Sequence, residues 1–115
     1  MNSHINPTET SSQSDCPIAK VIALFGDAWS ILIIRDLLSG PKRFGSLLSS
    51  LDGISSRTLT QRLKNLEQEQ LICRQEFHEK PPRVEYTLTE KGKELHGIIT
   101  AMKLFGEKYL SDISS

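Results

Sequence analysis

The hydrophobic pattern of this chain changes its period at Leu71, and that change limits the folds it can adopt. Before Leu71, apolar residues recur at intervals of three and four positions, which indicates amphipathic helices. Between Leu71 and Leu88 the pattern becomes β-prone, which indicates two strands. After Thr89 the helical spacing returns. The sequence therefore predicts a mainly α domain with a small β-hairpin, in the order α-α-α-α-β-β-α.

Capping and turn residues divide the first part of the chain into four helices. Pro17 favours a helix start, and Asp27 is placed to cap the second helix. Ser39-Gly40-Pro41 ends that helix, while Asp52-Gly53 separates a short third helix from a fourth that Ser55 caps. The apolar stripes of these helices comprise Ile18, Val21, Ile22, Phe25, Trp29, Leu32, Ile33, Leu37, Leu38, Phe44, Leu47, Leu48, Leu51, Leu59, Leu63 and Leu66.

The two predicted strands are joined by the Pro-containing loop 78–82, which is longer than a two-residue hairpin turn. Cys73 lies on the first strand and is expected to be a small core residue. Thr89 is predicted to cap one last helix. Its apolar stripe, more extensive than a small core needs, comprises Leu95, Ile98, Ile99, Met102, Phe105 and Tyr109.

Length and composition limit the remaining possibilities. A chain of 115 residues is long enough for one domain, which we place at 15–115 behind a flexible polar tail at 1–14. The longest apolar run, at 21–25, has five residues and the N-terminus lacks a signal-peptide pattern, so we expect a cytoplasmic protein without a membrane partner. Two cysteines without CxxC spacing, and three scattered histidines, favour neither a disulfide framework nor a metal or other cofactor.

The charge of the chain is unevenly distributed although its net value is zero. Residues 41–64 contain five basic residues and one acidic residue, a local charge of +4. A nucleic-acid-binding face responds to its local field, so the zero net charge does not exclude one. The five basic residues are Lys42, Arg43, Arg57, Arg62 and Lys64.

The third and fourth helices, with Gly53 in the turn between them, have the layout of a helix-turn-helix. Major-groove readout uses long or hydroxylated side chains near a helix start, because that end enters the groove. We expect base contacts from Ser56, Arg57, Thr58, Gln61 and Arg62, and contacts to the DNA backbone from Lys42, Arg43 and Lys64. The alternative is an ordinary solvated helix face.

The hairpin loop is a candidate wing, because a flexible basic loop suits phosphate or minor-groove contact. Its candidate residues are His78, Lys80 and Arg83. The alternative is a surface turn in which neighbouring glutamates cancel this positive charge. A helix-turn-helix followed by a wing is a far more specific signal than either part alone.

Cys16 lies where the first helix begins. The positive end of a helix favours a reactive thiolate, which makes Cys16 a candidate sensor of oxidants or electrophiles. An inert, partly packed thiol is the alternative. The stripe of the last helix predicts a homodimer, because such a stripe commonly buries against a second subunit. Dimerisation also fits DNA recognition, since paired half-sites double the readout. The alternative is that this helix only packs onto its own domain.

A series of short motifs resembles the HxlR family of winged helix-turn-helix regulators, which is related to the MarR group. The resemblance covers roughly residues 16–110 and lies in Cys16-Pro17, Gly26-Asp27-Ala28-Trp29, Lys42-Arg43-Phe44, Gly53-Ile54-Ser55, Leu59-Thr60-Gln61-Arg62-Leu63, Pro82-Arg83-Val84-Glu85-Tyr86 and Leu88-Thr89. It implies a dimer formed by the first and last helices and a sensing role for Cys16. The implied interface residues are Ile18, Ile22, Ile98, Met102, Phe105 and Tyr109.

Two positions depart from that family's pattern. Ala28 replaces the usual basic residue before the tryptophan, and Gln70 replaces the usual glycine after the fourth helix. A non-glycine residue in a left-handed cap costs on the order of 1 kcal/mol, so we expect the end of this helix to differ locally.

The leading hypothesis is therefore a dimeric double-stranded DNA-binding transcription regulator, expected to be a repressor, whose affinity responds to a small molecule or to oxidation of Cys16. A winged-helix adaptor that binds an acidic protein is the alternative, although a protein interface would favour aromatic anchors on the fourth helix. An enzyme is not expected, because the sequence has no phosphate-binding loop and no nucleophile–base pair at readable spacing.

Overall fold

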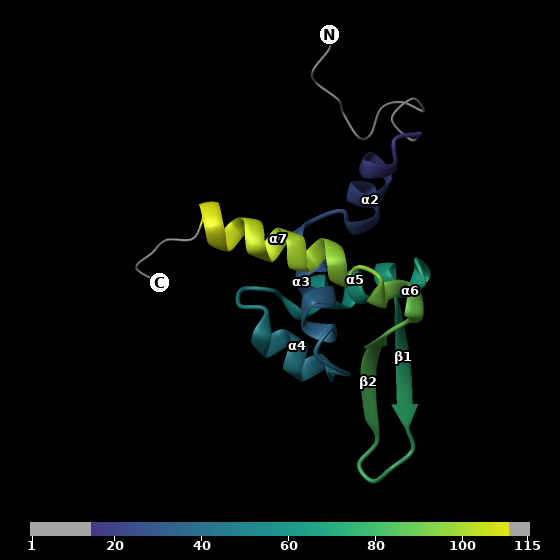
Figure 1. The fold of residues 1–115 in the computed structure, drawn as a ribbon. Helices are drawn as coiled ribbons and strands as arrows, with labels where there is room; N and C mark the ends of the chain where they lie inside the picture. The colour runs from purple at the N-terminus through teal and green to yellow at the C-terminus, as the bar shows by residue number, and fades with distance from the viewer. Residues whose placement is uncertain (1–14, 111–115) are drawn as a thin grey trace.

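The computed structural model describes residues 15–110 (Figure 1). The predicted tail at 1–14 and the last residues, 111–115, lie outside the described range. The order of elements confirms the predicted mainly α fold with one hairpin. These elements are α2 (Pro17–Phe25), α3 (Ala28–Leu37), α4 (Phe44–Ser50), α5 (Ser56–Gln68), β1 (Ile72–Phe77), β2 (Arg83–Leu88), α6 (Glu90–Lys93) and α7 (His96–Tyr109).

The core is centred on α3 and α5. Ile33 and Ile34 of α3 are fully buried, and so is Leu59 of α5. The predicted leucine stripe of α5 is confirmed, since Leu63 and Leu66 are also buried, one turn apart along the same face. Packing one face of α5 onto α3 leaves the opposite face of the helix in solvent.

The junction between α2 and α3 lies at the residues that the sequence indicated. The carboxylate of Asp27 accepts a hydrogen bond of 3.3 Å from the backbone N–H of Ser30 and so caps α3. Gly26, with a φ of +78°, ends α2 in a conformation that favours glycine. As a result α2 and α3 meet at an angle of 83°, and α2 stands away from the other helices (Figure 1).

The hairpin is antiparallel and extends away from the helices (Figure 1). Its strands pair from Ile72 opposite Leu88 to Phe77 opposite Arg83. The expectation that Cys73 lies in the core is wrong, because its thiol is exposed. Ile72 faces the core, so the next side chain points to the opposite face of the strand.

The predicted last helix is present as two helices, α6 and α7. Between them, the N–H of Glu94 donates to the carbonyl of Lys91 at 3.2 Å, and that of Leu95 donates to Gly92 at 3.1 Å. These tight i to i+3 bonds turn the chain, so that α6 lies at the end of β2 and α7 crosses α3 (Figure 1). The sequence predicted a single helix, and in this detail it was wrong.

The end of α5 keeps its left-handed cap although glycine is missing there. Gln70 has a φ of +63°, and the N–H of Leu71 donates to the carbonyl of Leu66 at 3.0 Å. This is the bond pattern of a Schellman-type helix end. The expected local difference at Gln70 is therefore not found. Ala28, the other departure, is an exposed first residue of α3.

Within residues 15–110, no single helix combines the length and hydropathy needed to cross a membrane. The pair α2 and α3 passes that test only when the two are counted together, and they are sharply bent at Gly26.

Candidate nucleic-acid interface

The helix-turn-helix consists of α4 and α5 with the turn 51–55 between them. Leu51 and Ile54 are buried and hold this turn against the core, while Gly53 has a φ of +91° and allows the chain to reverse. Ser55 then accepts a hydrogen bond of 3.0 Å from the N–H of Thr58, so the predicted cap of α5 is confirmed. The cap fixes which residues form the first turn of α5.

The outer face of α5 carries polar and basic side chains. Arg57, Gln61 and Lys64 are exposed and follow one another at spacings of four and three residues, which places them on one face. The Gln61 amide donates a hydrogen bond of 3.2 Å to Asn65. Among the described residues, Arg57 and Lys64 form no ion pair, in contrast to Arg62. We call Arg57, Gln61 and Lys64 the outer face of α5.

Two of the predicted base-contacting residues lie at the start of this helix. Ser56 is exposed in the first turn. Thr58 is half-buried, and its hydroxyl accepts a hydrogen bond of 3.0 Å from the hydroxyl of Ser55. Ser56 is therefore open to a ligand, whereas Thr58 is partly engaged in the capping of its own helix.

Arg62 does not share the outer face. Its Nε and Nη2 lie 2.8 Å and 2.7 Å from Oδ2 of Asp27, at the start of α3. The hydrogen bond from Arg62 holds the pKa of the Asp27 carboxyl below its usual value, and the carboxylate raises the pKa of the guanidinium. The expectation that Arg62 reads bases assumed a free guanidinium, and in the structure an acid already binds it.

The spacing of Arg62 from the leucines is a local signal that its side chain lies away from the outer face of α5. Its residue type alone favoured base readout. Arg62 follows the buried Leu59 by three residues and precedes the buried Leu66 by four. Those spacings put a side chain beside the apolar stripe, not opposite it. Its partner Asp27 is distant in the chain, so only the packing of α3 against α5 identifies the pair.

Lys42 and Arg43, which we expected to contact the DNA backbone, lie just before α4. Arg43 is exposed, whereas Lys42 is half-buried. The backbone of Lys42 pairs with Tyr86 of β2, donating a bond of 3.0 Å and accepting one of 2.7 Å. This segment therefore extends the hairpin sheet at the edge of β2 and ties the start of α4 to the wing.

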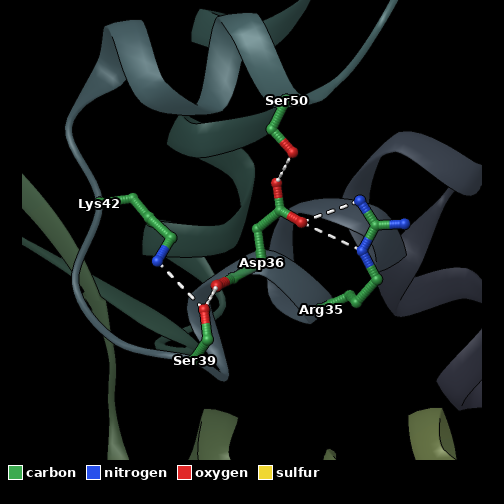
Figure 2. A network of polar contacts seen from close by, with 5 residues as sticks. All are labelled: Arg35, Asp36, Ser39, Lys42 and Ser50. Atoms are coloured by element: carbon green, nitrogen blue, oxygen red, sulfur yellow. Dashed lines mark hydrogen bonds and ion pairs between the residues drawn. The ribbon is translucent and has the colours of Figure 1, made fainter.

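A polar network holds the end of α3 against α4 (Figure 2). Its centre is Asp36, which accepts hydrogen bonds from Arg35 and, at 2.6 Å, from the hydroxyl of Ser50 in the last turn of α4. The Nζ of Lys42 donates to the hydroxyl of Ser39 at 3.0 Å, and that hydroxyl donates to the carbonyl of Asp36. The Lys42 ammonium is thus anchored by a neutral group, and among residues 15–110 it forms no ion pair.

The hairpin that carries the predicted wing contains acidic side chains close to its basic ones. Arg83 lies over the ring of Phe77 at 4.0 Å and approaches Glu79 at 3.2 Å and Glu85 at 3.4 Å. Its positive charge is therefore largely compensated within the hairpin. The other two predicted wing residues, His78 and Lys80, are exposed. The sequence had left open whether glutamates cancel the wing charge, and for Arg83 they do.

Cys16 occupies the N-cap position of α2, as expected from the sequence. Its thiol is exposed and makes no capping hydrogen bond. Within residues 15–110, no three His, Cys, Asp or Glu side chains come close enough together to hold a metal ion.

An uncovered apolar surface lies along α2 and α7. Ile18 and Ile22 of α2 are 72% and 61% exposed, and Phe105 of α7 is 58% exposed. A cavity of about 420 Å³ opens between α2, α3 and α7, with Val21, Ile22, Phe25 and Met102 among its lining. The other predicted interface residues, Ile98, Met102 and Tyr109, are exposed too, as are Leu104 and Leu110, which the predicted interface did not include.

Comparison with known proteins places this arrangement in a family. Residues 24–114 match the model of the HxlR-like helix-turn-helix family. An uncharacterized HTH-type transcriptional regulator, sll1512, from Synechocystis sp. is 44% identical over 99 residues, which cover 86% of this chain and 73% of that protein. A MarR-family regulator from Porphyromonas gingivalis W83 superposes with a TM-score of 0.81 at 35% identity, covering 89% of this chain and 100% of that one.

A third similar structure is the redox regulator HypR in its oxidized form. It superposes with a TM-score of 0.79 at 33% identity, covering 84% of this chain and 100% of the HypR chain. The motifs that resemble the HxlR family, the helix-turn-helix with its hairpin and these similarities agree with one another. The chain belongs to the HxlR-like helix-turn-helix family, and it is a transcriptional regulator with a winged helix-turn-helix fold.

Proposed function

We propose that this regulator binds double-stranded DNA as a homodimer, with the outer face of α5 in the major groove. The observation that carries the proposal is the exposure of Arg57, Gln61 and Lys64 together on one face. Arginine reads guanine and glutamine reads adenine through paired hydrogen bonds. Ser56 and Thr58 lie in the first turn, where a recognition helix comes nearest to the bases.

Contacts to the DNA backbone are assigned to α5 itself and to the segment just before α4. Arg43 is exposed at the start of α4, and Lys64 lies on the outer face of α5 itself. Lys42, anchored by Ser39 at 3.0 Å, adds a third positive charge. Charges at these positions attract phosphates without reading sequence, so they supply affinity and orientation.

The wing contact is assigned to His78 and Lys80. Both side chains are exposed in the loop between β1 and β2, at the end of the hairpin that lies farthest from the helices (Figure 1). Arg83 instead holds the loop in shape through Phe77 and the two glutamates. The proposed division is that Arg83 stabilises the wing and the other two residues approach the duplex.

The apolar surface of α2 and α7 supports the homodimer. Each exposed aliphatic or aromatic side chain of this surface costs free energy in water, at roughly 25 cal/mol per Å² of apolar area. A second copy presents the same surface and covers it, as in an isologous interface. Met102→Glu should therefore produce monomers, and sedimentation velocity measures this change in oligomeric state. Lys103→Glu, on the same helix, is the control and should remain dimeric.

Cys16 is proposed as the site at which an oxidant changes DNA affinity. Cys16 has an exposed thiol and is the N-cap residue of α2. This helix carries Ile18 and Ile22 of the proposed dimer surface. A two-electron oxidant such as hydrogen peroxide converts a thiol to a sulfenic acid and releases water. The similarity to HypR, a redox regulator, supports this assignment. A Cys16→Ser variant should keep its DNA affinity in peroxide, and a response equal to that of the parent would remove Cys16 as the sensor.

Repression is the outcome we propose for DNA binding. A dimer bound to an operator excludes other proteins from the same stretch of duplex, so repression needs no additional contact surface.

Anisotropy titrations at several salt concentrations test the DNA interface. Arg57→Ala should weaken binding to a selected duplex by about 1–3 kcal/mol. Lys64→Ala should lower the salt slope, the steepness with which the logarithm of the binding constant falls with the logarithm of salt concentration, by about 1. Lys103→Ala removes a charge from α7 and should change neither quantity. Binding that is unaltered in both α5 variants would remove this helix from the interface. Preference for an acidic protein over duplex DNA would favour the adaptor alternative.

A further inference from the structure

The ion pair between Asp27 and Arg62 connects the start of α3 to the middle of α5. The two oxygens of the Asp27 carboxylate have separate partners. Oδ1 accepts from the N–H of Ser30 at 3.3 Å and caps α3, while Oδ2 accepts from Nε and Nη2 of Arg62 at 2.8 Å and 2.7 Å. One carboxylate thus fixes a helix terminus and a guanidinium at the same time.

This pair lies at the border between the core and the surface. The side chains of Arg62 and Asp27 are 28% and 33% exposed, so the contact is neither fully screened by water nor deeply buried. Arg62 flanks the leucine stripe that packs α5 onto α3, next to Leu63. The leucine stripe opposes rotation of α5 about its own axis only through packing. A hydrogen-bonded pair at the edge of the stripe adds a directional restraint on the same rotation.

We infer that Arg62 is a positioning residue for DNA recognition, which fixes the direction of the outer face of α5 through Asp27. This inference rests on the proposed function. Rotation of α5 would move Arg57 and Gln61 relative to the groove, and misplacement of contacting atoms by about 1 Å costs binding energy. Asp27 immediately follows the bend at Gly26, so the pair also links α5 to the junction between α2 and α3.

A direct contact between Arg62 and DNA is the alternative role, and the two roles predict opposite changes in DNA affinity when Asp27 is replaced. If Arg62 contacted DNA, Asp27 would compete with the phosphates for the guanidinium. Replacing Asp27 with asparagine would then free Arg62, remove a negative charge and strengthen binding. If Arg62 positions α5, the same replacement weakens binding although the protein becomes more positive.

Asp27→Asn is suited to this test because asparagine caps helices about as well as aspartate. The variant therefore keeps the cap of α3 and loses the charge that holds Arg62. We expect it to bind a selected duplex about 3- to 30-fold more weakly than the parent, with an unchanged salt slope. Asp52→Asn, an exposed acid in the turn before α5, is the matched control and should bind no more weakly than the parent.

Hydrogen exchange of the free protein gives a second readout that does not depend on DNA. Amides of α5 should exchange faster in Asp27→Asn than in the parent or in Asp52→Asn. Arg62→Gln should reproduce both effects, and it serves as the test if Asp27→Asn does not fold. Tighter DNA binding by Asp27→Asn, or unchanged exchange in α5, would overturn the inference. Failure of the parent to bind any duplex would instead overturn the proposed function, while the exchange measurement would still show whether the pair stabilises α5.

Discussion

A Cβ atom added to Gly92 would stand 2.1 Å from the carbonyl oxygen of Leu71. This close approach lets α6 dock against the segment that joins α5 to β1. The same junction is held by Thr89, whose hydroxyl donates to the carbonyl of Gln70 at 2.7 Å, and by Lys91, whose Nζ donates to the carbonyl of Glu69 at 2.9 Å. The segment 69–71 that directly follows α5 is therefore held by α6 and its cap.

Gly92→Ala should be destabilising, because its added methyl group meets backbone that cannot move without shifting α5 or β1. We expect a loss of about 1–3 kcal/mol in the free energy of unfolding, measured in urea. Gly97→Ala is the control, since Gly97 lies in α7 with open space around it. That variant should gain roughly 0.5–1 kcal/mol, because alanine favours helix more than glycine does. Equal effects at the two positions would contradict the close packing at Gly92.

Gln70→Gly should stabilise the protein. Gln70 holds a φ of +63° at the end of α5, and a side chain there costs on the order of 1 kcal/mol that glycine avoids. The midpoint of urea unfolding should rise accordingly. Gln68→Gly, at the last residue of α5, should instead lower the midpoint of urea unfolding, because glycine lowers helix stability. A loss of stability in Gln70→Gly would show that its side chain contributes more than its backbone conformation costs.

The stability of the protein should fall in acid partly because of Asp27. Arg62 depresses the pKa of this carboxyl in the folded state relative to the unfolded state. Its contribution is fully present above the unfolded-state pKa, near 4, and is lost as pH falls through the lower folded-state value. The slope of unfolding free energy against pH below about pH 4 should therefore be smaller in Asp27→Asn than in the parent. Asp52→Asn should retain the parental slope, and identical slopes in parent and Asp27→Asn would contradict the pairing.

Ser50→Ala should weaken the network that joins α3 to α4. The Ser50 hydroxyl donates to the Asp36 carboxylate at 2.6 Å, and the Asp36 side chain is only 11% exposed (Figure 2). Loss of this hydrogen bond should cost about 0.5–1.5 kcal/mol of unfolding free energy. Ser49→Ala removes a hydroxyl from the neighbouring exposed position and should have a smaller effect. Equal effects at the two serines would remove the Asp36 contact as the cause.

Local signals in the sequence were sufficient to predict most elements of the fold. Asp27 and Ser55 accept capping bonds at the helix starts where we expected them. Leu59, Leu63 and Leu66 were predicted from helical spacing alone, and they are buried. These features depend on residues within one or two turns, so a single sequence contains the information needed to find them.

The features that the sequence did not show involve contacts between segments that are distant in the chain. Cys73 was expected in the core because it neighbours apolar residues, but the hairpin leaves the helices after Ile72. The base contact predicted for Arg62 stays a prediction, but its residue type gave no sign of the ion pair with Asp27, 35 residues away. The break between α6 and α7 directly follows the short helix that docks on Leu71 through Gly92. Tertiary packing decides each of these, although the spacing of Arg62 from the leucines was a local sign of its place beside the apolar stripe.

Photo-crosslinking from the outer face of α5 tests most directly whether this helix enters the major groove. A benzoylphenylalanine residue would replace Gln61 on α5 or, as the control, Lys103 on α7, in protein bound to a duplex selected from a random pool. We predict crosslinks from position 61 to bases within each half of a two-fold symmetric site, and none from position 103. Crosslinks to DNA from position 103 but not from position 61 would contradict the proposed interface.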